Sequence, residues 1–332
     1  MNLGKTVFLI GPGFIGWNVL ELLVNEGYTV SALVRRKEHA MSIHKSGALT
    51  IEGSLDDHDL IAEHSVKNDI VFHTATADHL PSVQAVLDGI KQRARDGKST
   101  IFIHTSGTGV LDDHALGEFK GEKVYSDDKP EDIDALPDDA PHRPIDLAIV
   151  NAAKELGEKA KLAIMIPPTI YGFNPKHNRL SSQIPFITRF ALKHGYAGHV
   201  GKGLSVESQI HVCDLARAYI FVLHYMECTS PQELLVNPYF FCENGKEFSW
   251  QEVAEQVGKA LHAKGLIKDP RPVSFPEAEW DDLYGDITGA VIGLNSRSRA
   301  VRLRQLGWTP REKGMWESFE QDELPAILAE AR

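Results

Sequence analysis

Hydrophobic and polar positions alternate in blocks along the first third of the chain. Apolar runs of strand length occur at 7–10, 28–34, 48–53 and 100–106, and the stretches between them carry apolar residues at helical spacing, as at 81–95. Strands that alternate with helices of this length predict a parallel sheet covered on both faces. We therefore expect an α/β fold with a doubly wound parallel sheet, in which ligands bind beyond the carboxyl ends of the strands.

A glycine-rich turn joins the first strand to the first helix. Gly11, Gly13 and Gly16 form a G-x-G-x-x-G pattern between the apolar run and the helical spacing that follows. A side chain at Gly11 or Gly13 would hold a phosphate away from the backbone amides, and the helix N-terminus offers N–H groups and the positive end of a dipole. This context predicts a dinucleotide-binding sheet of the Rossmann type. The alternative is a sheet of the same design that holds no nucleotide.

The end of the second strand is basic. Folds that select NAD carry an acid here, about 20 residues beyond the glycines, which binds the ribose 2′-hydroxyl. This chain has Arg35 and Arg36 instead, and guanidinium groups suit a 2′-phosphate. We therefore expect NADP(H) in preference to NAD(H), and the alternative is a solvated loop of positive charge.

The composition narrows the range of partners. The formal net charge of -11 argues against a nucleic-acid or anionic-membrane partner, because nucleic-acid binding depends on the neutralisation of phosphates. Three cysteines without C-x-x-C spacing indicate a reducing, cytoplasmic location, and the scattered histidines predict no metal site. No apolar run has the length of a membrane span. A basic cluster near the end, which we interpret as a solvated helix face or else as a site for an anionic substrate group, comprises Arg297, Arg299, Arg302 and Arg304.

The rest of the chain continues the alternation less regularly. The stretch from 112 to 144 is acidic and rich in proline, and we expect an irregular flap near the mouth of the crevice. Helical spacing is predicted at 145–159, 181–194, 214–225, 250–263 and 295–306, with strands at 162–166, 209–212 and 238–244.

Several short motifs resemble those of the extended short-chain dehydrogenase/reductases, which include nucleotide-sugar epimerases, dehydratases and dihydroflavonol-type reductases. The resemblance implies an NAD(P)-binding domain at 1–172 that the chain re-enters at about 206–236, and a smaller substrate-binding part at 173–205 and 237–332. It also implies a homodimer with a small-molecule substrate. The motifs follow in family order over nearly the whole chain: Gly13-Phe-Ile-Gly, Asp69-Ile-Val-Phe-His-Thr-Ala, Phe102-Ile-His-Thr-Ser, Pro168-Thr-Ile-Tyr-Gly and Leu306-Gly-Trp-Thr-Pro.

The usual catalytic tyrosine of this family is missing. Members carry Tyr-x-x-x-Lys on one helix, and the spacing of four places both side chains on one face. Here the lysine matches Lys154 and the tyrosine position is Val150, which cannot exchange a proton. The strand-end serine or threonine aligns with Gly107, and its neighbours Ser106 and Thr108 either donate a hydrogen bond in its place or form a turn that only contacts cofactor or backbone. Other candidates for the acid, each with a structural explanation as well, are Tyr171, Tyr125, His142 and Asp146.

Cofactor contacts are expected from the glycine turn, the strand ends and the family lysine. The set is Gly11, Gly13, Phe14, Ile15, Gly16, Arg35, Arg36, Leu55, Ala75, Ser106, Lys154, Pro167 and Thr169. We therefore expect an NADP(H)-binding oxidoreductase-like protein that reduces or otherwise transforms a small carbonyl metabolite by a variant acid–base step. Two alternatives stay open: a non-catalytic NmrA-like dinucleotide sensor, and a nucleotide-sugar epimerase or dehydratase, against which the missing tyrosine counts.

Overall fold

A computed structural model describes residues 4–330, and its centre is a seven-stranded sheet in which all neighbouring strands are parallel. The strands at 70–73 and 100–105, in the middle of the sheet, are buried along their whole length, as expected for a sheet covered on both faces. The doubly wound α/β fold that the sequence predicts is confirmed. From one edge to the other the strands are β11 (Tyr239–Phe241), β7 (Ala160–Ile166), β5 (Thr100–Thr105), β4 (Ile70–His73), β1 (Thr6–Ile10), β2 (Thr29–Val34) and β3 (Leu49–Glu52).

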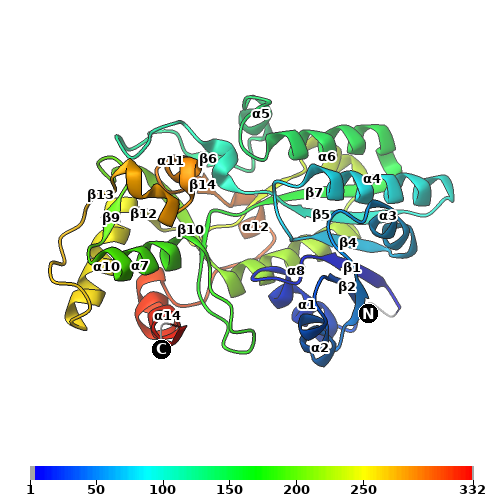
Figure 1. Cartoon of the computed structure of the whole chain (residues 1–332). Helices are drawn as coiled ribbons and strands as arrows, with labels where there is room; N and C mark the ends of the chain where they lie inside the picture. Colours follow the sequence, from blue (N-terminus) through cyan, green and yellow to red (C-terminus); the bar gives the residue numbers. More distant parts are fainter. Residues whose placement is uncertain (1–3, 331–332) are drawn as a thin grey trace.

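Helices cover both faces of this sheet (Figure 1). One face carries α3 (His58–Lys67), α4 (Leu80–Arg95) and α6 (Arg143–Leu156), with α4 packed against the other two. The other face carries α1 (Gly16–Asn25), α2 (Lys37–Lys45) and α8 (Val212–Cys228).

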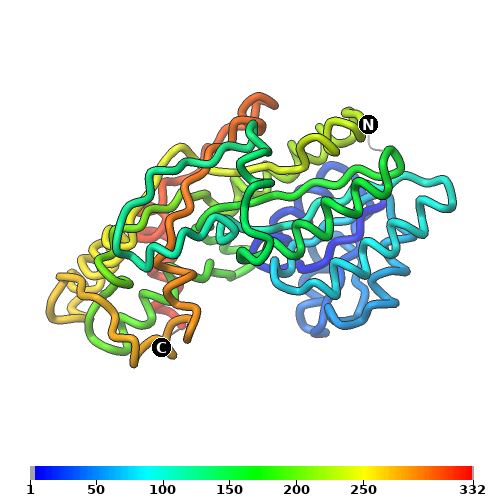
Figure 2. The backbone as a smooth tube through the Cα atoms, turned by 90° about the horizontal axis from the view of Figure 1, so that it is seen from above, coloured from blue at the N-terminus to red at the C-terminus, as the bar shows by residue number. Residues whose placement is uncertain are grey.

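A smaller lobe lies beside the sheet and has a hydrophobic core of its own, built around Phe190, Trp250 and Phe319. Figure 2 shows the two lobes side by side, with most of the N-terminal half of the chain in one and most of the C-terminal third in the other. The lobe contains α7 (Gln183–His194), α10 (Trp250–Ala263), α11 (Thr288–Ile292), α13 (Met315–Ser318), α14 (Leu324–Glu330), the paired strands β9 (Gly198–His199) and β13 (Val273–Ser274), and the short sheet of β8 (Thr169–Tyr171), β10 (Val206–His211) and β12 (Glu247–Ser249).

Two regions differ from the predicted outline. The chain returns to the large sheet as β11, after α9 (Pro231–Val236), so the sheet draws on residues beyond the predicted boundary at 236. The stretch at 295–306 is not one helix but β14 (Ser298–Arg299) followed by α12 (Val301–Gln305), because β14 pairs with β6 (Tyr125–Ser126) of the flap. The flap also holds α5 (Pro130–Asp134). Among residues 4–330, no helix combines the length and apolar character that a bilayer crossing requires.

Candidate active site at the carboxyl edge of the sheet

The glycine turn after β1 packs tightly against the end of β4. Gly11 has a φ of +91°, and a β-carbon there would lie 2.3 Å from Ala75 Cα. A β-carbon on Gly16 would lie 2.2 Å from the Gly11 carbonyl oxygen, which accepts a hydrogen bond of 2.9 Å from the Thr74 hydroxyl. A β-carbon on Gly13, by contrast, would meet nothing nearer than that same oxygen at 4.0 Å. The turn is therefore packed tightly against the sheet at Gly11 and Gly16, whereas the space beside Gly13 is open.

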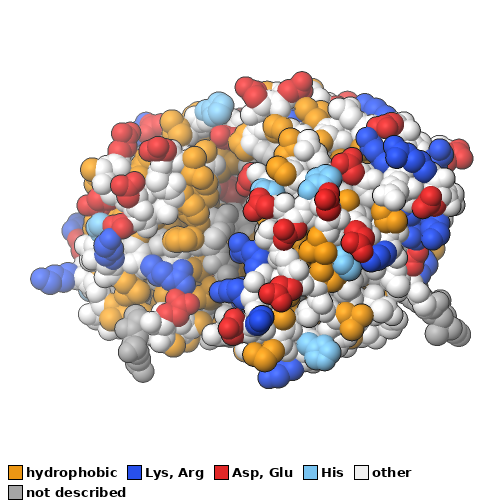
Figure 3. Space-filling view, turned by 45° about the vertical axis from the view of Figure 1, so that its right-hand side comes forward, with side chains coloured by type: hydrophobic (Ala, Val, Ile, Leu, Met, Phe, Trp, Pro, Cys, Tyr) orange, Lys and Arg blue, Asp and Glu red, His pale blue; other side chains and the backbone are white. Residues whose placement is uncertain are grey.

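This open cradle fits a dinucleotide. It stands at the N-terminus of α1, a ten-residue helix, where backbone N–H groups and the helix dipole favour a phosphate. The surface is hollowed between the two lobes, with basic side chains on one lip and hydrophobic side chains on the other (Figure 3). Other expected cofactor contacts lie in the turn or just beyond the strands of the large sheet, namely Phe14, Ile15, Leu55, Ala75 and Pro167.

Positive charge gathers beside the turn, near the end of β2. Arg179, from the loop between β8 and α7, places its Nη2 atom 3.3 Å from His39 Nε2 and its guanidinium 5.6 Å from the Trp17 ring. The His177 ring of the same loop stacks on Trp17 at 4.2 Å. Burial, together with the charges of Arg179 and Arg36, lowers the pKa of His39. The sequence alone could not reveal this cluster, because about 140 residues separate Arg179 from α2.

Within residues 4–330, no carboxylate forms an ion pair with Arg36, His39 or Arg179. The nearby Glu21 lies 3.2 Å from His177 instead. The Nε atom of Arg179 is buried and lacks a hydrogen-bond partner in the described chain. The predicted contact Arg35 is exposed at the end of β2. The cluster therefore carries unneutralised positive charge next to the cradle.

A buried hydrogen bond closes the carboxyl end of β5. The Ser106 hydroxyl donates to Asp146 Oδ2 at 2.9 Å, and both residues are almost fully buried. The second oxygen of Asp146 has no partner among the described residues. Burial raises the pKa of Asp146 to about 7, although the hydrogen bond from Ser106 acts in the opposite direction. Of the predicted site residues, Ser106 is thus placed next to a group that can exchange a proton near neutral pH.

His142 lies one helical turn before Asp146, at the N-cap of α6. Its Nδ1 atom lies 2.7 Å from Asp78 Oδ1, in the segment between β4 and α4. This hydrogen bond lowers the pKa of Asp78. The Nε2 atom lies 2.9 Å from the position that a β-carbon on Gly109 would occupy, and 3.3 Å from that of Gly107. The imidazole therefore packs over the turn that follows Ser106.

Thr108 and Thr169 do not face an open crevice but belong to a buried network between the lobes. Thr108 donates to Ser296 Oγ at 3.1 Å, and Ser296 donates in turn to Glu207 Oε2. Thr169 donates to the same Glu207 oxygen at 2.6 Å. The Thr108 hydroxyl thus links the large sheet to the smaller lobe, whereas the Thr169 hydroxyl bonds within the smaller lobe.

The Tyr171 side chain is also buried, and its hydroxyl is hydrogen-bonded within the protein. Its hydroxyl donates to the carbonyl oxygen of Lys313 at 2.8 Å and accepts from the Asn244 side chain at 3.1 Å. The residue is 1% exposed, and burial raises the pKa of its hydroxyl. This placement corrects the expectation that Tyr171 replaces the missing acid.

Lys154 and Val150 lie away from this edge, contrary to the expected alignment. α6 runs antiparallel to the strands, so its first turn lies at the carboxyl edge and its last turn at the opposite edge, where Ala160 pairs with Thr100. Lys154 is exposed in the last turn, two helical turns beyond Asp146. α6 therefore presents Asp146, and not Lys154, to Ser106.

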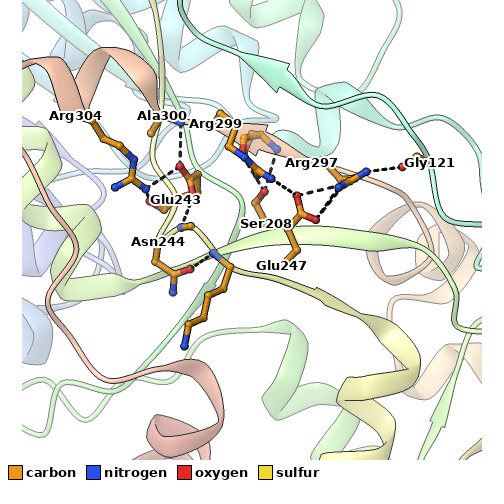
Figure 4. A network of polar contacts seen from close by, with 12 residues as sticks. Gly121, Ser208, Glu243, Asn244, Glu247, Arg297, Arg299, Ala300 and Arg304 are labelled. Atoms are coloured by element: carbon orange, nitrogen blue, oxygen red, sulfur yellow. Dashed lines mark hydrogen bonds and ion pairs between the residues drawn. The ribbon is translucent and has the colours of Figure 1, made fainter.

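The C-terminal arginines are paired within the protein (Figure 4). Arg297 binds both oxygens of Glu247, and Arg299 binds one of them at 2.9 Å. Arg304 binds Glu243 at 2.9 Å. Arg297, Arg299 and Arg304 are therefore held by carboxylates and do not form an open site for an anion.

Comparisons with known proteins agree with a dinucleotide-binding fold. Residues 11–134 match an NAD(P)H-binding family. The chain is 30% identical to oxidase ucsJ of Acremonium sp, over 92% of this chain and 93% of that protein. Its fold is similar to UDP-glucose 4-epimerase of Thermotoga maritima (TM-score 0.68, 18% identity, 99% of this chain and 100% of that one) and to yeast methylglyoxal/isovaleraldehyde reductase Gre2 with NADPH (TM-score 0.65, 17% identity, 98% and 99%). The chain belongs to the extended short-chain dehydrogenase/reductase family. Its part that matches the NAD(P)H-binding model contains the glycine turn.

Proposed function

We propose that this protein is an NADP(H)-dependent oxidoreductase that interconverts a small carbonyl metabolite and its alcohol. The observation that carries the proposal is the buried Ser106–Asp146 hydrogen bond at the end of β5, on the same edge as the open glycine cradle. Gly11 and Gly13 would hold the pyrophosphate, and the bound cofactor would supply or accept the hydride.

A chemical role explains Asp146 better than a binding role alone. A carboxylate without a charged partner is costly to bury, and a sensor of dinucleotides needs the cradle but not this group. Groups with perturbed pKa values beside a crevice are typical of active sites. The relative that is named an oxidase also favours redox chemistry. The epimerase alternative has less support, because α6 holds no tyrosine with which that chemistry could begin.

The unpaired basic cluster supports a preference for the phosphorylated cofactor. Arg36, His39 and Arg179 surround a position beside the end of β2, where folds of this type bind the adenine ribose. A 2′-phosphate would neutralise this charge and accept hydrogen bonds from the buried Nε of Arg179.

The test is a comparison of NADPH and NADH affinities by fluorescence titration, with the parent protein and two variants. Removal of a charge-assisted hydrogen bond costs on the order of 1.5–3 kcal/mol, so Arg36→Ala and Arg179→Ala should each weaken NADPH binding about tenfold or more. NADH affinity should change little. Lys45→Ala, at the far end of α2, is the control. Equal affinity of the parent for the two cofactors contradicts the proposed preference, and binding of neither contradicts the proposed function.

A further inference from the structure

His142 adopts a backbone conformation that its surroundings must enforce. Its φ is +66°, in the left-handed region that a residue with a β-carbon rarely enters. Such conformations persist where neighbouring structure fixes them, and they cluster at functional sites. Here the fixing contact is the 2.7 Å hydrogen bond between His142 Nδ1 and Asp78, two residues that are 64 positions apart in the chain.

The hydrogen bond determines which ring nitrogen is available. An ionised carboxylate only accepts hydrogen bonds, so Nδ1 carries a proton and Nε2 is the nitrogen that gains or loses one. No residue in the described part of the chain hydrogen-bonds Nε2, and the side chain is 20% exposed. The ring thus points a free nitrogen at the turn after Ser106.

The turn itself is shaped to receive this ring. Gly107 and Gly109 flank Thr108, and a β-carbon at Gly109 would approach Nε2 to 2.9 Å, closer than real contacts allow. The two glycines therefore leave the space that the imidazole occupies.

His142 is the N-cap residue of α6 and Asp146 lies in the first turn, so both stand at the end of the helix that lies at the carboxyl edge. Their spacing of four residues is that of the family's Tyr-x-x-x-Lys pair, but it falls eight residues before Val150 and Lys154. Asp146 contacts Ser106 directly. α6 thus brings two titratable side chains to the carboxyl edge in the absence of the usual pair.

We propose that His142 is the proton-transfer residue of this site and that Asp78 positions it. This inference rests on the proposed oxidoreductase function. In reduction, the carbonyl carbon gains a hydride from the reduced nicotinamide, which is oxidised by two electrons. His142 gives its Nε2 proton to the carbonyl oxygen, and the C=O π bond is replaced by new C–H and O–H bonds. The neutral imidazole that remains keeps its proton on Nδ1, hydrogen-bonded to Asp78. A proton from solvent then restores the protonated Nε2.

The first test observes His142 without any turnover, by NMR of protein labelled with ¹⁵N-histidine. Neutral His142 should carry its proton on Nδ1 in the parent and lose this tautomer preference in Asp78→Asn. Addition of NADP⁺ should shift the His142 signals and leave those of His224 unchanged, since His224 lies on α8 and bonds to Glu26. His142 signals that respond neither to Asp78→Asn nor to bound NADP⁺ overturn the inference. A protein that binds no cofactor contradicts the proposed function instead.

The second test measures NADPH oxidation with methylglyoxal and 2,3-butanedione as probes. A general acid contributes about 10²–10⁴ in rate, so His142→Gln should lower kcat by that factor while KM changes little. His142→Asn is the second variant, because asparagine tolerates the left-handed conformation and should preserve the fold. His224→Gln should behave as the parent. Unchanged kcat in folded His142 variants overturns the inference, and if the parent reduces neither probe, the NMR measurement decides alone.

Discussion

Glu207 is a buried carboxylate on β10, in the smaller lobe. It accepts hydrogen bonds from Thr169, from Ser296 and, at 2.9 Å, from the indole N–H of Trp250. Burial raises its pKa to about 7 in spite of these three donors. No local pattern in the sequence identifies such a residue, because its donors come from β8, α10 and the segment before β14.

The raised pKa makes Glu207 a source of pH dependence in folding. Its folded pKa lies above the ordinary value of 4.5, so its contribution to the free energy of unfolding is present at low pH and is lost as the pH rises through about 7. The whole effect is on the order of 3 kcal/mol. Glu207→Gln cannot titrate, so we expect the stability difference between parent and variant to shrink from pH 5 to pH 8.

Urea unfolding at four pH values between 5 and 8 measures this difference. Other buried carboxylates titrate equally in both proteins and cancel. Glu118→Gln, at an exposed residue paired with Lys202, is the control and should show a difference that is independent of pH. A Glu207→Gln curve that runs parallel to the parent's would show that Glu207 stays ionised throughout.

At the scale of elements, α6 shows what the sequence can and cannot predict. Apolar spacing predicts a helix at 145–159, and the observed helix is Arg143–Leu156. The site-facing end of that helix could not be predicted, because it depends on the path of the flap at 112–144 and on the bond to Asp78. The motif match therefore selected Lys154, although the antiparallel course of α6 carries that residue to the far edge.

The position of Lys154 leads to a prediction about the cofactor. Because Lys154 is exposed two turns beyond Asp146, we expect Lys154→Ala to leave the NADPH dissociation constant unchanged within about twofold. Arg36→Ala, measured in the same fluorescence titration, is the comparison variant and should lose NADPH affinity. A loss of tenfold or more in Lys154→Ala would show that α6 turns its last residues towards the cofactor.

At the scale of the whole molecule, the loop between β8 and α7 links the two lobes. In Figure 1 this green segment descends towards α1. Asn174 donates to Asn18 at 2.6 Å, and His177 stacks on Trp17, so the loop lies over the helix that begins at the glycine turn. The order of strands and helices could be predicted from hydrophobic periodicity. These contacts could not, because they join residues about 160 positions apart and no local sequence pattern indicates them.

The same loop should respond to the cofactor. Arg179 brings a second guanidinium next to that of Arg36, and their mutual repulsion weakens the packing of the loop on α1 until an anion is bound. A 2′-phosphate removes this repulsion, so NADPH should slow amide hydrogen exchange at 173–182 by about tenfold, and NADH should do so less. Hydrogen-exchange mass spectrometry measures both effects, with the exposed stretch at 262–266 as an internal control. In Arg179→Ala the two cofactors should protect the loop equally. Equal protection by NADPH and NADH in the parent would mean that the loop closes on some other part of the ligand.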